Sequence, residues 1–166
     1  MKPVGTKFRE TLLAWAAAIA LVVGVQFFAG RDLASGAPPE ITGKTLDGGT
    51  FPGLKSLPKP AVIYIWASWC QICRAMQDTV LSVGKESPLI TVATQSGSAT
   101  EVGEYLKKSG FDVPVVLDED GAIGKAFGAR GVPAVFILGA DGDIRFSTMG
   151  YTSGLGLRLR LWLAGL

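Results

Sequence analysis

Two cysteines, Cys70 and Cys73, lie two residues apart in the stretch YIWASWCQICR, residues 64–74, and they are the only cysteines among 166 residues. At positions i and i+3 of a first helical turn, two such side chains lie close enough to form a disulfide. The first sulfur would meet unpaired backbone N–H groups and the positive end of the helix dipole, which stabilise a thiolate. The spacing therefore predicts thiol–disulfide exchange, with Cys70 as the nucleophile and Cys73 as the residue that resolves the mixed disulfide.

Other uses of a cysteine pair fit this chain less well. Zinc needs four ligands, and two cysteines with no histidine supply half a site unless two copies share the metal. A c-type haem needs histidine directly after the second cysteine, where Arg74 stands. We predict no cofactor and no metal ligand. Cu(I) binding by both thiolates, helped by Met76 or Met149, and a static local disulfide stay open as alternatives.

The composition limits the remaining classes of function. Without histidine, the chain cannot form a Ser-His-Asp triad or a Cys-His nucleophile. A net charge of +2, with no basic stripe that interleaves aromatic residues, argues against nucleic acid as a partner. With 48% hydrophobic residues, the chain is long enough for one domain with its own core and an additional segment.

The cysteine pair follows a nearly continuous apolar run, AVIYIW at 61–66, which is typical of a strand buried on both faces. Further strands are predicted at 89–94, 113–118 and 134–138, the last continuing through a turn into 143–147 as a hairpin. Another hairpin is predicted within 40–51, around the glycine turn at 47–49. Helices are predicted at 70–85, 101–109, 122–127 and 152–166, where the alternating leucines of the last segment would also suit a strand.

This order of elements predicts an α/β fold with a mixed sheet and helices on both faces. The cysteine pair then falls at the carboxyl end of a central strand, where open α/β sheets place their chemistry.

A second feature lies at the N-terminus, where residues 11–30 form 20 consecutive residues without a charge. As a helix at about 1.5 Å per residue they span roughly 30 Å, the thickness of the hydrocarbon layer of a bilayer. Basic residues precede this stretch at Lys2, Lys7 and Arg9, and the positive-inside tendency keeps them in the cytoplasm.

We therefore expect a cytoplasmic basic N-terminus at 1–10, a transmembrane anchor at 11–30, a linker at 31–39 and an exported domain at 40–166. A cleaved signal peptide with its site near 33–37 is the alternative. In both cases the domain would lie in an oxidising compartment, where a disulfide persists.

The motif WASWCQICR closely resembles the signature of membrane-tethered thioredoxin-like proteins, and the resemblance covers about 40–166. It implies a thioredoxin-like mixed sheet flanked by helices, with an N-terminal hairpin and a central insert. The segment FGARGVPAVFILGADGDI resembles the part of that family that holds its cis-proline, which would be Pro133 after Val132. The family's partner peptides pair with this backbone as an added strand, so substrate is expected along Trp69, Val132 and Pro133.

The segment ITVATQSG and the ending GYTSGLGLRLRLWLAGL resemble more closely the suppressor-for-copper-sensitivity D group, which is TlpA-like. This resemblance implies a single-pass protein of the bacterial inner membrane with its catalytic domain in the periplasm. It also implies protein disulfides or dithiols as substrates, a DsbD-type membrane reductase as electron donor, and a role in copper tolerance or oxidative-stress defence. A thioredoxin-like adaptor without turnover is the alternative.

Two positions depart from the family pattern. Many thioredoxins carry a buried aspartate six residues before the first cysteine, where this chain has Tyr64, and cytochrome-maturation reductases often carry glutamate where it has Met76. The usual acid–base helper is thus missing from both places, which argues against a dedicated haem-site reductant. Asp78, Asp118 or water remain as candidates for this role. We also expect Trp66 to lie in the core.

Overall fold

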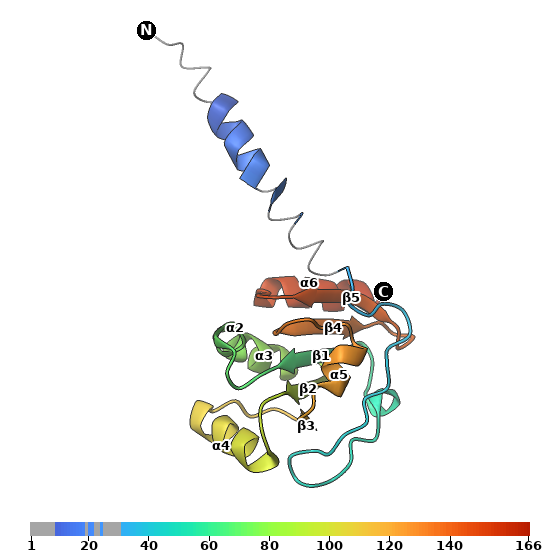
Figure 1. Ribbon diagram of the computed structural model, residues 1–166. Helices are drawn as coiled ribbons and strands as arrows, with labels where there is room; N and C mark the ends of the chain where they lie inside the picture. The colour runs from blue at the N-terminus through green and yellow to red at the C-terminus, as the bar shows by residue number, and fades with distance from the viewer. Residues whose placement is uncertain (1–8, 19, 22–23, 25–30) are drawn as a thin grey trace. The chain divides into compact units, whose positions relative to one another are not determined.

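The computed structural model describes residues 9–18, 20, 21, 24 and 31–166 of the chain (Figure 1). The chain divides into two compact units, Met1–Arg31 and Asp32–Leu166. In the first unit, residues 9–18 are helical. Within the described residues, no helix combines the length and the hydropathy that a membrane crossing requires. The predicted anchor at 11–30 lies partly outside the described residues.

The second unit is built on a five-stranded mixed sheet, as predicted. Its strands are β1 Ala61–Trp66, β2 Leu89–Thr94, β3 Val115–Asp118, β4 Ala134–Leu138 and β5 Ile144–Met149. The spatial order is β3-β2-β1-β4-β5, with β1, β2 and β3 parallel and with β4 and β5 antiparallel to their neighbours. The strand predicted to start at residue 113 begins two residues later, directly after Pro114, which has no N–H to donate to a ladder.

The helices are α2 Gln71–Ala75, α3 Gln77–Gly84, α4 Ala99–Ser109, α5 Ala122–Ala126 and α6 Gly154–Ala164, with a short 3₁₀ helix η1 at Leu54–Ser56. The continuous helix predicted over 70–85 is wrong in one respect, because it breaks at Met76 into α2 and α3. Helix α4 starts two residues earlier than predicted, because Ser98 and Glu101 form a reciprocal capping box. The leucine-rich ending is a helix, as predicted.

Both faces of the sheet carry a core, because successive residues of β1 point to opposite sides. Val62, Tyr64 and Trp66 belong to a cluster shared with α2, α3, α4 and α6. Ala61, Ile63 and Ile65 belong to a second cluster that includes Ile123 and Phe127 from the α5 region. All six residues of β1 are buried, as the apolar run predicted.

The hairpin predicted within 40–51 is reduced to a tight turn with one bridge between Lys44 and Thr50. The amide of Thr45 donates to the carbonyl of Gly49 at 2.9 Å. Between β2 and β4 the chain inserts α4, β3 and α5.

Residues 32–36, which fall in the segment expected to be a linker, pack onto the domain. Leu33 is buried, and the amide of Ala34 donates to the carbonyl of Phe127 at 3.0 Å. This close approach needs Gly128, because a Cβ there would lie 1.9 Å from the carbonyl oxygen of Asp32. The folded unit therefore begins at Asp32.

Candidate active site

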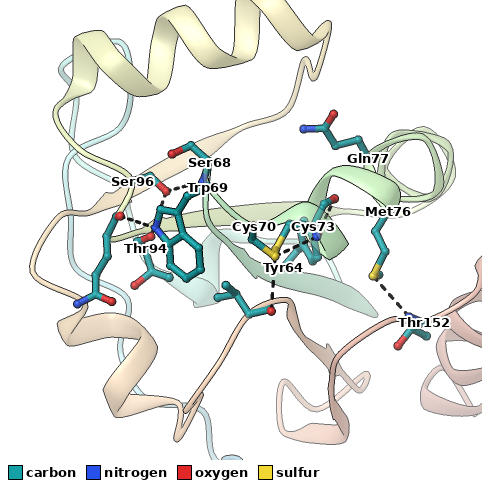
Figure 2. Close-up of a disulfide and its surroundings, with 12 residues drawn as sticks. Tyr64, Ser68, Trp69, Cys70, Cys73, Met76, Gln77, Thr94, Ser96 and Thr152 are labelled. Atoms are coloured by element: carbon teal, nitrogen blue, oxygen red, sulfur yellow. Dashed lines mark hydrogen bonds between the residues drawn. A yellow bond between two sulfur atoms is a disulfide. The ribbon is translucent and has the colours of Figure 1, made fainter.

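The two cysteines form a disulfide at the start of α2, at the carboxyl end of the central strand β1 (Figure 2). Their Cα atoms are 5.2 Å apart. Cys70 is the N-cap of α2, and its Sγ accepts the amide N–H of Cys73 at 3.0 Å. An N–H donated to this sulfur would stabilise a thiolate after reduction, which lowers a thiol pKa.

The two sulfurs differ in their access to solvent. Cys70 is 6% exposed and Cys73 only 1%. Cys70 Sγ also lies 3.5 Å from the carbonyl oxygen of Val132, which belongs to the loop before β4. The bond from Val132 to Pro133 is cis, as the resemblance implied, and the carbonyl of Pro133 accepts the amide of Gly150 at 2.8 Å.

Trp69 stands beside the disulfide with 63% of its surface exposed. Its indole N–H donates to the carbonyl oxygen of Gln95 at 2.9 Å. Trp69 and Val132 line the same cavity of about 580 Å³, together with Asp32 and Arg130. The structure therefore brings together Cys70, Trp69 and Val132, whereas Trp66 is buried in the core, as expected.

The loop that carries Trp69 is held by the turn that follows β2. Beyond the indole bond, the amide of Ser68 donates to Ser96 Oγ at 3.0 Å, and that hydroxyl donates to the carbonyl of Thr94 at 3.0 Å. Gln95 has a φ of 46°, in the left-handed region that residues other than glycine rarely adopt. Sequence reasoning missed this turn, because the acceptor for Trp69 is a backbone carbonyl that has no residue-type signature.

Tyr64 and Met76, the two residues that depart from the family pattern, both form hydrogen bonds with the backbone. The hydroxyl of Tyr64 donates to the carbonyl of Cys73 at 3.3 Å. Burial, with a smaller contribution from Tyr105, raises the pKa of Tyr64 well above its ordinary value, so it remains a protonated donor. Met76 is fully buried, and its Sδ accepts the amide N–H of Thr152 at 3.4 Å.

Neither carboxylate considered as a helper forms a hydrogen bond with the cysteine pair. Asp118 is buried, but its two oxygens accept the amides of Ile123 and Gly124 at 2.9 and 3.0 Å and so cap α5. Asp78 is exposed on α3. Among the residues that the structure describes, no three histidine, cysteine or acidic side chains gather where they could hold a metal ion.

A disulfide at the start of the helix that follows a central strand, with a cis-proline loop against its more exposed cysteine, defines the class of thioredoxin-fold disulfide oxidoreductases. The chain matches the model of the Redoxin family over residues 36–154 and belongs to that family. It is 34% identical over 128 residues to a thioredoxin-like protein of Haemophilus influenzae, which covers 75% of each chain.

A second relative is the thiol:disulfide interchange protein DsbE of Haemophilus influenzae, 30% identical over 93 residues, or 55% of this chain and 51% of DsbE. Among solved structures, MTB dsbF in mixed oxidised and reduced forms is 26% identical with a TM-score of 0.67, covering 78% of this chain and all of the other. Together with the Cys70–Cys73 pair, these findings identify the chain as a thioredoxin-like protein disulfide oxidoreductase, as predicted.

Proposed function

We propose that this protein is a membrane-anchored oxidoreductase that exchanges electrons with protein disulfides in the bacterial periplasm, with Cys70 as the attacking sulfur. The observation that supports these roles is the unequal burial of the two cysteines. Both cysteines belong to the same apolar cluster, but Cys70 is 6% exposed and its sulfur lies against the amide of Cys73 and the carbonyl of Val132, whereas Cys73 is 1% exposed. A partner sulfur would therefore reach Cys70 more readily than Cys73.

The reaction is a two-electron exchange. In the reduced protein, the Cys70 thiolate attacks one sulfur of a substrate disulfide, forms a mixed disulfide and releases the other substrate sulfur as a thiolate. Cys73 then loses its proton and attacks Cys70 Sγ, which releases the second substrate thiol and closes the Cys70–Cys73 disulfide. The substrate gains two electrons and two protons, and a dithiol donor returns the pair to its reduced state.

Substrate would dock along the loop that holds Trp69 and along Val132 and Pro133. Trp69 offers a largely exposed indole that the carbonyl of Gln95 holds in place. An extended peptide beside Val132 would add a short strand next to the attacking sulfur. Aromatic side chains of this kind supply contact area with little loss of rotamer freedom on binding.

Location and electron donor are proposed from sequence features. The 20 uncharged residues at 11–30 behind basic residues support a single-pass anchor with the domain in the periplasm. The resemblance of the tail supports a DsbD-type membrane reductase as donor and a role in copper tolerance or oxidative-stress defence. Carbonate extraction of membranes and protease accessibility in spheroplasts test this placement, and a chain released by carbonate would contradict the anchor.

A trapping experiment tests the chemistry. Cys73→Ala should accumulate mixed disulfides through Cys70 under mildly oxidising conditions, because the resolving sulfur is gone. The matched variant Cys70→Ala should trap almost nothing, because the remaining sulfur is buried. Equal trapping by both variants would refute the assigned roles. Stoichiometric Cu(I) binding without disulfide exchange would instead favour a copper protein, and retained function after replacing both cysteines would favour an adaptor.

The direction of electron flow is proposed to be reducing or isomerising, because a DsbD-type donor would keep the pair reduced. The measurement is the redox state of Cys70 and Cys73 in cells with and without that donor, read by alkylation of free thiols. Loss of the donor should shift the pair from dithiol to disulfide. A pair that stays oxidised in both strains would show that the protein is an oxidant.

A further inference from the structure

Helix α6 is apolar on two opposite sides. Its inner side packs on the domain through Leu157, Leu161 and Ala164, which are all buried. Its outer side, here called the outer stripe, consists of four exposed residues. The exposed fractions are 80% for Leu155, 54% for Leu159, 63% for Trp162 and 42% for Leu163. At about 100° per residue these four positions cover an arc of roughly 100°, the width of an apolar face that normally packs against something.

The outer stripe is contiguous. Leu166, just past the end of α6, extends it with 85% of its surface exposed. Helix α6 lies alongside β4 and β5 and against α3 (Figure 1), so the domain's contacts with α6 are made on the inner side. Exposed apolar patches of this kind on a soluble domain mark a site of association.

The charges on α6 are all of one sign. Arg158 and Arg160 lie on opposite flanks of the outer stripe by the same 100° rotation, and α6 contains no acidic residue. Arg158 is held on its flank by two 2.7 Å bonds to the carboxylate of Glu86 and one of 2.8 Å to Ser82. Arg160 turns back to the carbonyl of Gly156 at 3.4 Å.

This charge pattern indicates what kind of partner binds the outer stripe. A second copy laid on the outer stripe would find no acidic residue on α6 to pair with Arg160, and Glu86 is already bonded to Arg158. An anionic lipid surface accepts an apolar stripe of leucine and tryptophan with a cationic residue beside it, because the long side chain of Arg160 can reach the headgroups while the stripe enters the acyl boundary. Tryptophan is also favoured at that depth.

We propose that α6 lies in the plane of an anionic membrane surface, with the outer stripe inserted between the headgroups and the acyl chains. This docking uses only residues of the folded unit, and it does not depend on the redox chemistry. It would hold the domain in a defined orientation at the lipid surface, near electron donors that are themselves membrane proteins.

Quenching by brominated lipid tests the docking on the full chain reconstituted in vesicles. Bromine on the acyl chains quenches only tryptophans that lie among them. The difference in emission between the chain and its Trp162→Phe variant isolates Trp162 from the other tryptophans. We expect this difference to disappear in brominated phosphatidylglycerol vesicles and to persist in unbrominated ones. An unchanged difference in both would overturn the proposal.

Two variants separate the contributions of the stripe and its flanks. Leu155→Gln with Leu159→Gln should restore the emission of Trp162 in brominated vesicles, because the apolar contact is lost. Arg160→Gln should weaken docking to anionic vesicles about fivefold, the factor that corresponds to about 1 kcal/mol for one arginine at such a surface. The matched control is Lys107→Gln, which removes the same charge from α4 and should leave the quenching unchanged.

The rival occupants give different results. A dimer that forms in detergent and that Leu155→Gln with Leu159→Gln abolishes, without quenching of Trp162 by lipid, would show a second copy on the stripe and overturn the proposal. Loss of turnover with a protein donor in those variants, again without quenching, would show a protein partner and overturn it as well. Disulfide exchange with a small disulfide should stay unchanged in every variant, which confirms that each is folded.

Discussion

Replacing Gly128 by Ala should destabilise the domain far more than the same replacement at Gly110. Both glycines have positive φ values, 69° and 67°, so an added Cβ meets the same backbone strain of about 1 kcal/mol at each. At Gly110 the added Cβ has no heavy atom within 4 Å. At Gly128 it would lie 1.9 Å from the carbonyl oxygen of Asp32, so the segment that begins at Asp32 must move away.

The cost of that movement follows from what the segment contributes. Leu33 is 7% exposed, and its exposure to water would cost about 2 kcal/mol. The hydrogen bond from Ala34 to Phe127 contributes about 1 kcal/mol more. The ion pair of Asp32 with Arg130 adds little, because both side chains are exposed. Gly128→Ala should therefore lower the free energy of unfolding by about 4 kcal/mol and Gly110→Ala by about 1 kcal/mol.

Urea unfolding followed by tryptophan fluorescence measures both values, and the slope with denaturant must stay the same for the comparison to hold. Asp32 also lines the cavity beside Trp69, so Gly128→Ala should weaken substrate binding as well as stability. If the two variants lose the same free energy within about 0.5 kcal/mol, the packing of residues 32–36 on the domain does not stabilise it, and the reasoning fails.

Three further changes probe single interactions. Met76→Leu keeps the volume but leaves the amide of Thr152 without its acceptor, so unfolding should become easier by about 1–2 kcal/mol in urea; an unchanged midpoint would show that the sulfur is not the acceptor. Ser98→Ala removes the capping box of α4 and should cost about 1 kcal/mol, with the loss of helicity read by circular dichroism. The hydrogen bond from Arg158 lowers the pKa of Glu86, so the carboxylate stabilises the fold above its ordinary pKa of 4.5 and stops doing so as the pH falls through the lowered value. Urea unfolding at several pH values should therefore show that Glu86→Gln is less stable than the parent near neutrality and equally stable in strong acid. A difference in stability that grows as the pH falls would contradict the lowered pKa of Glu86.

The strands and the cysteine site could be predicted from the sequence, because each depends on a local pattern. The apolar run at 61–66 and the two cysteines after it carry their own signal, since a strand buried on both faces leaves no polar alternation. The apolar run also predicted that Trp66 is buried, whereas the cis bond before Pro133 was predicted from the family resemblance. The break at Met76 has no such signal, because a buried sulfur that accepts the amide of Thr152 depends on a contact 76 residues away.

Contacts between backbone groups could not be predicted from the sequence either. The expected linker at 31–39 reads as small and polar, yet Gly128 lets residues 32–36 pack against the domain. The support of Trp69 by the carbonyl of Gln95 is hidden for a related reason, because every residue type carries a carbonyl. Local patterns thus predict which residues react, whereas the elements that hold them in place depend on long-range contacts.

The surroundings of Cys73 limit how the catalytic cycle handles its protons. Attack by this sulfur requires loss of a proton within an apolar cluster. Tyr64 cannot accept the proton, because burial raises its pKa and its hydroxyl donates to the Cys73 carbonyl, while both oxygens of Asp118 are engaged by α5. Cys70 is the more exposed of the two cysteines, so we expect the proton of Cys73 to reach solvent on that side. The substrate sulfur leaves Cys70 as Cys73 attacks, and a leaving thiol of lower pKa departs faster. Substrates with more acidic thiols should therefore be resolved faster, which kinetics with a series of model disulfides would measure.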